Sequence, residues 1–336
     1  MIDELVDPGT FAVHPAGAPW GVLSAIGNTP LVPLEKVFED APFRLFGKLE
    51  MLNPGGSIKD RAAVRMLMEG REQGRIGPRT TVIESSSGNL GIGLAQACLR
   101  LGIRFVCVVD TCITPSNLAV LKAYGVQVEM VEQPHRPGGS LLEARIARVQ
   151  ALCEELPDSI WINQYANEMN AMAHRQTMSE IDHAMDGEID YLFVATSTCG
   201  TLRGCSEYVR SHGMRTRIVA VDAVGSVIFG QTPQKRLIPG HGASRMPELY
   251  YPGLEDEHVH VTDRECVEGC LRLLRTEAIF AGGSSGAVIS AIEKYRAQIR
   301  PGASCAAVLC DRGDRYLETI YSDSWQREHL GTGFSA

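Results

Sequence analysis

The hydrophobic residues of this chain gather in short runs that alternate with longer stretches of helical periodicity. The runs are rich in β-branched residues and are apolar at nearly every position, as in FVCVV at 105–109. Strands that are buried on both faces of a parallel sheet have this pattern, because neither face meets water. The pattern predicts strands over 80–85, 104–110, 126–132, 190–196, 217–223 and 305–310.

The stretches between these runs place apolar residues three or four positions apart, which predicts α-helices. Helices are expected over 60–73, 91–101, 116–124, 141–155, 171–185, 201–212, 263–276 and 286–298. Alternation of strands and helices is typical of doubly wound α/β folds, and 336 residues suggest about two domains. The loop 231–251 is irregular, contains three prolines and is long enough to suggest a functional role.

Composition narrows the function classes. The chain is 44% hydrophobic and carries a net charge of −8, so a large core is expected, and nucleic acid and anionic membranes are disfavoured as partners. No apolar run approaches the ~18 residues of a membrane span, and the acidic N-terminus does not resemble a signal peptide. Several of the ten cysteines lie in apolar runs and no CxxC pair is present, which predicts reduced thiols, no metal site and a cytoplasmic location.

The first candidate for chemistry is Lys59 in NPGGSIKDR, where a tight turn gives way to a predicted helix. Ser57 is placed to cap this helix, and the helix dipole disfavours a positive charge in its first turn. That position favours a neutral amine, which can form a Schiff base with an aldehyde. A Walker phosphate loop is excluded because GxxxxGK[ST] is absent, whereas an ordinary surface lysine remains an alternative.

Three further turns open predicted helices, and the first two of them follow predicted strands. ESSSGNLGIG (84–93) crowds hydroxyls at a helix N-terminus, which suits a small carboxylate. Its glycine spacing and Asp110 keep a dinucleotide-binding alternative open. STCGT (197–201) has the hydroxyls and glycine of a phosphate site, and AGGSSGAVIS (281–290) offers a serine to a heterocyclic nitrogen or as a helix cap.

Taken in this order, the motifs resemble the β-family, or fold type II, of pyridoxal-phosphate enzymes, which includes cysteine synthase and cystathionine β-synthase. IGNTPLVPL (26–34) and NQYANE (163–168) belong to the same resemblance, which covers nearly the whole chain. It implies two doubly wound domains of the tryptophan synthase β type. Residues 1–50 and 162–336 would form the large cofactor-anchoring domain, and 51–161 the smaller, mobile substrate-loop domain.

The resemblance implies a role for each motif residue. Lys59 would carry the pyridoxal 5'-phosphate as a Schiff base and act as the catalytic base, and Asn89 would bond the cofactor's 3-hydroxyl. The phosphate would be held by Ser197, Thr198, Cys199, Gly200 and Thr201, although the family often has glycine at 197 and 199. The substrate carboxylate would be held by Ser86, Ser87, Gly88, Asn89 and Gln164, with Leu90 in place of the family's usual threonine.

Ser284 would face the pyridine nitrogen of the cofactor. An uncharged hydroxyl does not keep that nitrogen protonated as an aspartate does, so the ring is a weaker electron sink. This favours loss of a β-substituent after removal of the α-proton, and disfavours transamination and decarboxylation. The expected reaction class is therefore β-replacement.

Arg245 resembles an arginine found in family members that use O-phosphoserine, and arginine suits bidentate contact with phosphate. A solvated loop arginine is the alternative. A branch of the family, the N-(2-amino-2-carboxyethyl)-L-glutamate synthases, is most similar through stretches such as VAVDAVGSVIFG and DRGDRYLETIYSD. This implies O-phospho-L-serine and L-glutamate as substrates, for 2,3-diaminopropionate and siderophore biosynthesis, and a homodimer.

The resemblance places Tyr165 and Ser197 beside the cofactor, where they would select the second substrate. Arg136 and Arg175 are candidates for binding the glutamate carboxylates. Three other functions stay open on sequence alone: an O-phosphoserine-dependent cysteine synthase, a catalytically silent binding protein that kept the fold, and a dehydrogenase.

Overall fold

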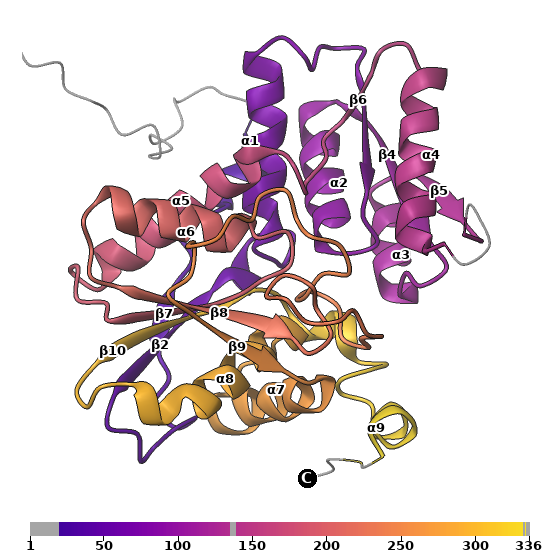
Figure 1. Ribbon diagram of the computed structural model, residues 1–336. Coiled ribbons are helices and arrows are strands. Elements are labelled where there is room, and N and C mark those ends of the chain that lie inside the picture. The colour runs from indigo at the N-terminus through magenta and orange to yellow at the C-terminus, as the bar shows by residue number, and fades with distance from the viewer. Residues whose placement is uncertain (1–19, 135–138, 332, 334–336) are drawn as a thin grey trace, which may run out of the picture.

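The computed structural model describes residues 20–134, 139–331 and 333. They form two open β-sheets, each covered by helices on both faces (Figure 1). The smaller sheet is entirely parallel in the order β5-β4-β3-β6. Its strands are β3 (Thr81–Ser85), β4 (Arg104–Asp110), β5 (Gln127–Val131) and β6 (Ser159–Trp161).

The larger sheet has the order β1-β2-β10-β7-β8-β9. Its edge strand β1 runs antiparallel to its neighbour, and the other described pairs are parallel. Its strands are β1 (Leu31–Pro33), β2 (Arg44–Leu49), β7 (Tyr191–Ala195), β8 (Arg217–Ala223), β9 (Glu257–Val261) and β10 (Ser304–Leu309).

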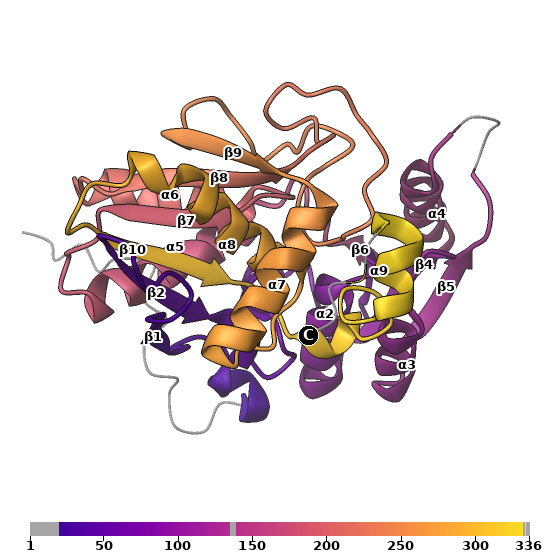
Figure 2. The same ribbon diagram turned by 90° about the horizontal axis from the view of Figure 1, so that it is seen from below.

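Helices cover both faces of each sheet, as Figures 1 and 2 show. On the larger sheet, α5 (Glu168–Ala184) and α6 (Gly200–Ser211) lie on one face, and α7 (Asp263–Glu277) and α8 (Gly283–Tyr295) on the other. On the smaller sheet, one face packs on α1 (Lys59–Glu72), α2 (Asn89–Leu101) and α3 (Pro115–Ala123), and the other on α4 (Leu141–Glu155). The described residues also form α9 (Asp323–Leu330) and the short 3₁₀ helices Gly21–Ala25, Glu50–Leu52, Arg296–Gln298 and Gly313–Tyr316.

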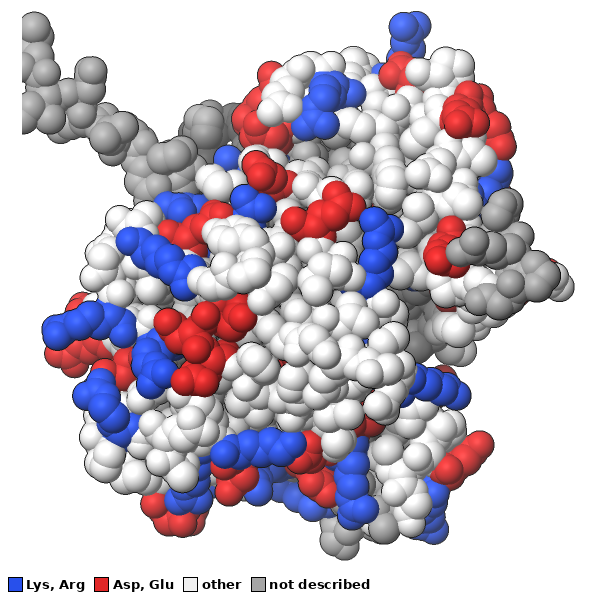
Figure 3. All heavy atoms as spheres, in the orientation of Figure 1, with Lys and Arg blue, Asp and Glu red and all other residues white. Residues whose placement is uncertain are grey.

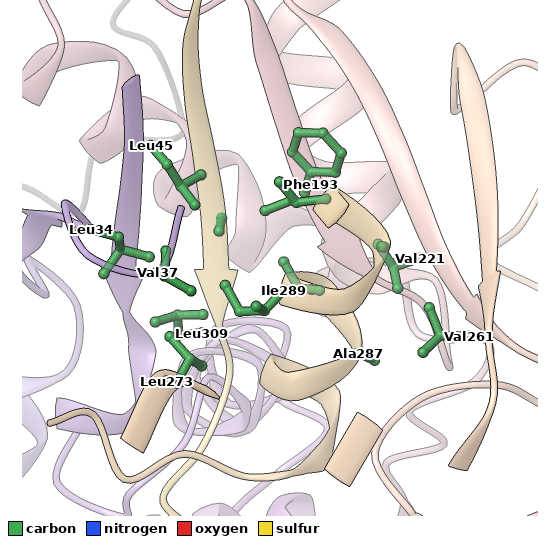
Figure 4. Close-up of a cluster of buried hydrophobic side chains, with 14 of the residues drawn as sticks. Leu34, Val37, Leu45, Phe193, Val221, Val261, Leu273, Ala287, Ile289 and Leu309 are labelled. Carbon is green, nitrogen blue, oxygen red and sulfur yellow. The ribbon is translucent and has the colours of Figure 1, made fainter. Parts of the chain in front are cut away.

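The continuous apolar runs explain this layering, because successive side chains of a strand point to opposite faces. Phe193 and Val221 belong to the core beneath α7 and α8, which Figure 4 shows in close-up. Their sequence neighbours Leu192 and Ala220 belong to the separate core beneath α5 and α6. A strand with only one apolar face could not fill both cores.

The predicted α/β class is confirmed, and all six predicted strands and eight predicted helices are present within a few residues. The pattern missed β1, β2, β6, β9 and α9. Two of these strands are only three residues long, and the other two carry polar residues such as Lys48 and His258 that interrupt the apolar run. The predicted domain division at residues 50/51 and 161/162 stays a prediction.

Among the described residues, the charged surface and the cysteines do not indicate any further binding site. Basic and acidic side chains are interspersed on the face in Figure 3 rather than gathered by sign. All ten cysteines are free, and only Cys112 is exposed. Within the described ranges, no helix combines the length and apolar character needed to cross a bilayer.

Candidate active site

One cavity of about 360 Å³ collects the chemistry-bearing turns. It lies where parallel strands of both sheets end and helices begin, the usual position of ligand sites in open α/β sheets. We call it the Lys59 cavity. Of the residues predicted from sequence, it is lined by Lys59, Ser86, Ser87, Gly88, Asn89, Gln164, Tyr165, Ser197, Thr198, Cys199, Gly200, Thr201 and Ser284.

Lys59 is the first residue of α1 and is half-buried in the cavity wall. The backbone N–H of Ile58 donates to the carbonyl of Cys310 at 2.8 Å, which ties the start of α1 to the end of β10. The hydroxyl of Ser57 accepts from the Lys59 N–H at 3.2 Å, as the predicted cap requires, although the N-cap position itself is Ile58. These two hydrogen bonds therefore hold the backbone at the start of the helix that carries Lys59.

A buried ion network holds α1 from behind. Arg61 donates to Glu50 at 2.7 Å and to Glu180 at 2.6 Å, and Lys48 contacts Glu180 at 2.6 Å. Burial alone would raise the pKa of Glu50, but the Arg61 guanidinium outweighs it and holds that pKa below its usual value. The network joins β2, α1 and α5, so it positions the helix that carries Lys59.

Asp60 is the neighbour of Lys59 and is almost fully buried. One carboxylate oxygen accepts from the Gly55 N–H at 2.5 Å, while the other has no hydrogen-bond partner among the described residues. Burial raises the pKa of this carboxyl to about 7. The turn before Lys59 is therefore closed by a carboxyl that resists ionisation.

The hydroxyl-rich turn after β3 lines the opposite part of the cavity. The Ser87 hydroxyl accepts from Arg145 at 2.8 Å, and its carbonyl accepts from Asn117 at 3.1 Å. Arg145 also pairs with Asp110 at 3.1 Å. Asp110, which kept the dinucleotide alternative open, is thus paired with an arginine inside the cavity.

Asn89 begins α2 and meets the C-terminal segment of the chain. Its amide donates to Asp311 at 2.7 Å, and its carbonyl oxygen accepts from Arg315. Tyr316 in turn donates to Asp311 at 2.6 Å. Sequence reasoning assigned no role to Arg315 and Tyr316, which both line the cavity. The one sequence signal for these two residues was their place in the stretch DRGDRYLETIYSD. The contact of Arg315 with Asn89 could not be predicted, because 226 positions separate the two residues.

The turn 197–201 forms a cradle at the N-terminus of α6. Cys199 adopts a left-handed conformation (φ 64°), and its own side chain does not cap the helix. The Gly200 N–H donates to the Thr198 hydroxyl at 3.4 Å. A Cβ on Gly200 would lie 2.3 Å from Asn170 Oδ1, so a larger residue here would have to displace the buried Asn170 side chain. The N–H groups at a helix N-terminus favour a phosphate, and the cradle therefore fits the phosphate of the predicted cofactor.

Ser284 lies in the first turn of α8 and is 3% exposed. Its hydroxyl lies close to Gly240, where a Cβ would come within 3.6 Å of it. Both residues line the Lys59 cavity. An uncharged donor or acceptor therefore stands in the same cavity as the phosphate cradle, as a pyridine ring carrying that phosphate requires.

Arg245 is the predicted site residue that does not line the Lys59 cavity. It lines an adjoining cavity of about 290 Å³, and Tyr165 and Ser197 line both. Its side chain is 64% exposed and lies 3.3 Å from Glu248. Among the described residues, the arginines that line the Lys59 cavity are Arg145 and Arg315.

Two arginines, Arg136 and Arg175, were predicted to bind the glutamate carboxylates. Arg175 is outside both cavities and donates to Ser211 at 3.1 Å. Arg136 lies outside the described residues. Among the residues with described positions, no group of three His, Cys, Asp or Glu side chains could hold a metal ion.

Comparison with known proteins decides the family. Residues 22–311 match the family model described as pyridoxal-phosphate dependent enzyme. The chain belongs to this family. Pyridoxal phosphate is therefore its cofactor, and the dinucleotide alternative is set aside.

Solved structures narrow the relationship. O-ureido-L-serine synthase is similar with a TM-score of 0.83 and 28% identity, over 89% of this chain and 94% of that one. An O-acetylserine-dependent cystathionine β-synthase from Helicobacter pylori gives a TM-score of 0.82 and 27% identity, over 90% and 98%. O-acetylserine sulfhydrylase isoform 3 from Entamoeba histolytica gives a TM-score of 0.83 and 29% identity, over 89% of this chain and 90% of that one. The chain is thus a fold type II enzyme similar to β-replacement enzymes of the cysteine synthase family.

Proposed function

We propose that this enzyme condenses O-phospho-L-serine with L-glutamate to give N-(2-amino-2-carboxyethyl)-L-glutamate and phosphate. The product would serve 2,3-diaminopropionate and siderophore biosynthesis. We further propose that it works as a cytoplasmic homodimer. The reaction is a β-replacement, the class represented by the similar solved structures.

The observation that supports an amino acid as second substrate is the adjoining cavity. It meets the Lys59 cavity at Tyr165 and Ser197 and contains Arg236 and Arg245. A sulfide nucleophile needs neither this volume nor these positive charges. A nucleophile with additional carboxylates needs both, because a carboxylate removed from water must find charged or amide donors.

The residues of the Lys59 cavity have separable roles in this proposal. Pyridoxal phosphate, when bound, accepts the electron pair left at the α-carbon when an amino acid loses its α-proton. The N-terminus of α6 would hold its phosphate, Asn89 its 3-hydroxyl, and Ser284 its ring nitrogen. Lys59 would carry the cofactor and move the α-proton at its Nζ atom.

Substrate contacts would come from the neighbouring turn. The hydroxyls of Ser86 and Ser87, the amides of Gly88 and Asn89, and the side chain of Gln164 would hold the carboxylate of phosphoserine. Arg245 would contact its phosphate. To do so, the arginine must leave Glu248, which costs little because both side chains are more than half exposed.

A nucleophile screen tests the proposal. The purified enzyme is given O-phospho-L-serine with either L-glutamate or sulfide, and the products are identified by mass. We expect the glutamate adduct and one phosphate released per adduct formed. Formation of cysteine from sulfide without any glutamate adduct would reject the proposal in favour of an O-phosphoserine-dependent cysteine synthase.

A further inference from the structure

The cavity that adjoins the Lys59 cavity is lined by a partly buried arginine, Arg236. Arg236 lies in the irregular loop that follows β8, and its side chain lines this cavity together with Tyr165 and Ser197. We call it the Arg236 cavity. Sequence reasoning singled out the loop but not this arginine.

Arg236 is held in place by its own loop. One terminal nitrogen donates to the carbonyl of His241 at 3.0 Å, and the other donates to the Ser244 hydroxyl at 2.9 Å. Asp263 fixes the adjacent backbone, since its two oxygens accept from the N–H groups of Leu237 and Ile238 at 2.9 and 3.0 Å. The guanidinium is therefore oriented before any ligand arrives.

The charge of Arg236 is not neutralised locally. It forms no ion pair with a carboxylate of the described residues, and its buried Nε has no hydrogen-bond partner among them. Burial lowers the pKa of the guanidinium, against a weaker opposing effect of Asp222 and Asp263. A cation that is partly removed from water and lacks an anion is unfavourable, and a bound carboxylate lowers that cost.

Apart from Glu248, which also lines the cavity and pairs with Arg245 at 3.3 Å, the other lining residues complement a short carbon chain that ends in a carboxylate. Leu142 and Ile146 of α4 and the indole of Trp161 give it an apolar wall. Gln150 and Asn163 add neutral amides. Methylene groups would pack on the apolar wall while the carboxylate reaches the guanidinium, which offers paired donors in a fixed plane.

We propose that the Arg236 cavity binds the side-chain carboxylate of the amino-acid nucleophile and that Arg236 selects a dicarboxylic amino acid over its amide. The nucleophilic amine would then lie near Tyr165 and Ser197, where this cavity meets the Lys59 cavity. Arg245 is a weaker candidate for this contact because it is exposed and already faces Glu248. This inference rests on the proposed function.

The test compares glutamate with glutamine as nucleophile. In the wild-type enzyme we expect a clear preference for glutamate in kcat/KM. Arg236→Met should raise the KM for glutamate by about 10- to 100-fold and remove that preference, because a charged hydrogen bond is lost. Arg236→Lys should recover part of the preference. Phosphate release from phosphoserine alone should stay within about twofold, because in this proposal Arg236 contacts the nucleophile whereas Arg245 contacts phosphoserine.

A control variant and two further measurements distinguish a failure of the proposed function from a failure of the Arg236 assignment. Arg327→Met removes an exposed arginine of α9 that pairs with Asp323, and it should leave the preference unchanged. The thermal midpoint and the visible spectrum of each variant check that the fold and the cofactor site survive. If wild-type enzyme makes no glutamate adduct, the proposed function fails and this inference with it. If wild-type condenses glutamate and Arg236→Met keeps the full preference, only this inference is overturned.

Discussion

The Arg61 guanidinium lies 2.7 Å from Glu50, and neither side chain is more than 2% exposed. The contact joins α1, two residues after Lys59, to the 3₁₀ helix that follows β2. Glu180 of α5 accepts from the same guanidinium, so three segments meet at one cation. An ion pair this deeply buried is chiefly a positioning device, because desolvation cancels much of its attraction.

Glu50→Gln should destabilise the enzyme by about 3 kcal/mol, because it removes the fully buried one of the two anions that pair with Arg61. The free energy of unfolding in urea measures this. Glu188→Gln is the matched control, since Glu188 lies 3.9 Å from Arg44 and both side chains are largely exposed. We expect the control to change stability by less than about 1 kcal/mol. Equal effects of the two substitutions would contradict the positioning role.

Lys59→Ala should abolish the visible absorption of the covalently bound cofactor and with it the β-replacement activity. The reason is that, among the described residues, no other lysine lines the Lys59 cavity. Absorption spectra of the purified variants provide the measurement. Lys122→Ala, an exposed position on α3, should keep both spectrum and activity. An unchanged spectrum in Lys59→Ala would disprove the assignment.

Arg245→Met should raise the KM for O-phosphoserine about tenfold, because one charged contact to the phosphate is lost. Initial rates at saturating glutamate measure the change. Arg145→Met is the informative comparison, since Arg145 lines the Lys59 cavity and Arg245 does not. A large effect of Arg145→Met with none of Arg245→Met would assign the phosphate contact to Arg145 instead.

Asp60→Asn should flatten the dependence of stability on pH. Burial raises the pKa of Asp60 from 3.8 to about 7, so the folded state holds a proton that the unfolded state releases. The resulting stability is fully present below about pH 4 and is lost as the pH rises through 7. A difference in pKa of this size between the folded and unfolded states corresponds to roughly a few kcal/mol of stability.

Urea unfolding at pH 5 and at pH 8 measures this dependence. We expect the stability of Asp60→Asn relative to wild type to be greater at pH 8 than at pH 5, since the variant carries no charge to bury. Glu84 has its pKa raised to about 7 by burial as well, but it is present in both proteins and cancels in the comparison. A constant difference between the two pH values would show that Asp60 ionises normally.

The parts of the site that sequence reasoning found are those made by local motifs. The hydroxyl turn before Asn89 and the cradle at Gly200 each follow a strand and open a helix, and the turns at Lys59 and Ser284 also open helices. Parallel α/β topology brings the ends of such strands to one edge, so their convergence could be expected. Arg236 and Arg315 could not be found in this way, because neither lies in a turn that follows a strand and opens a helix.

By itself, the sequence determined the α/β class and the order of most strands and helices, and it singled out Lys59 and the three turns that line the same cavity. These depend on periodicity and on turn chemistry, which act over a few residues. Only the tertiary structure decided that Arg245 faces an adjoining cavity, that Arg236 is an oriented cation without an anion among the described residues, and that Arg315 reaches Asn89. Those relationships join positions far apart in the chain, and packing of the whole fold sets the distances between them.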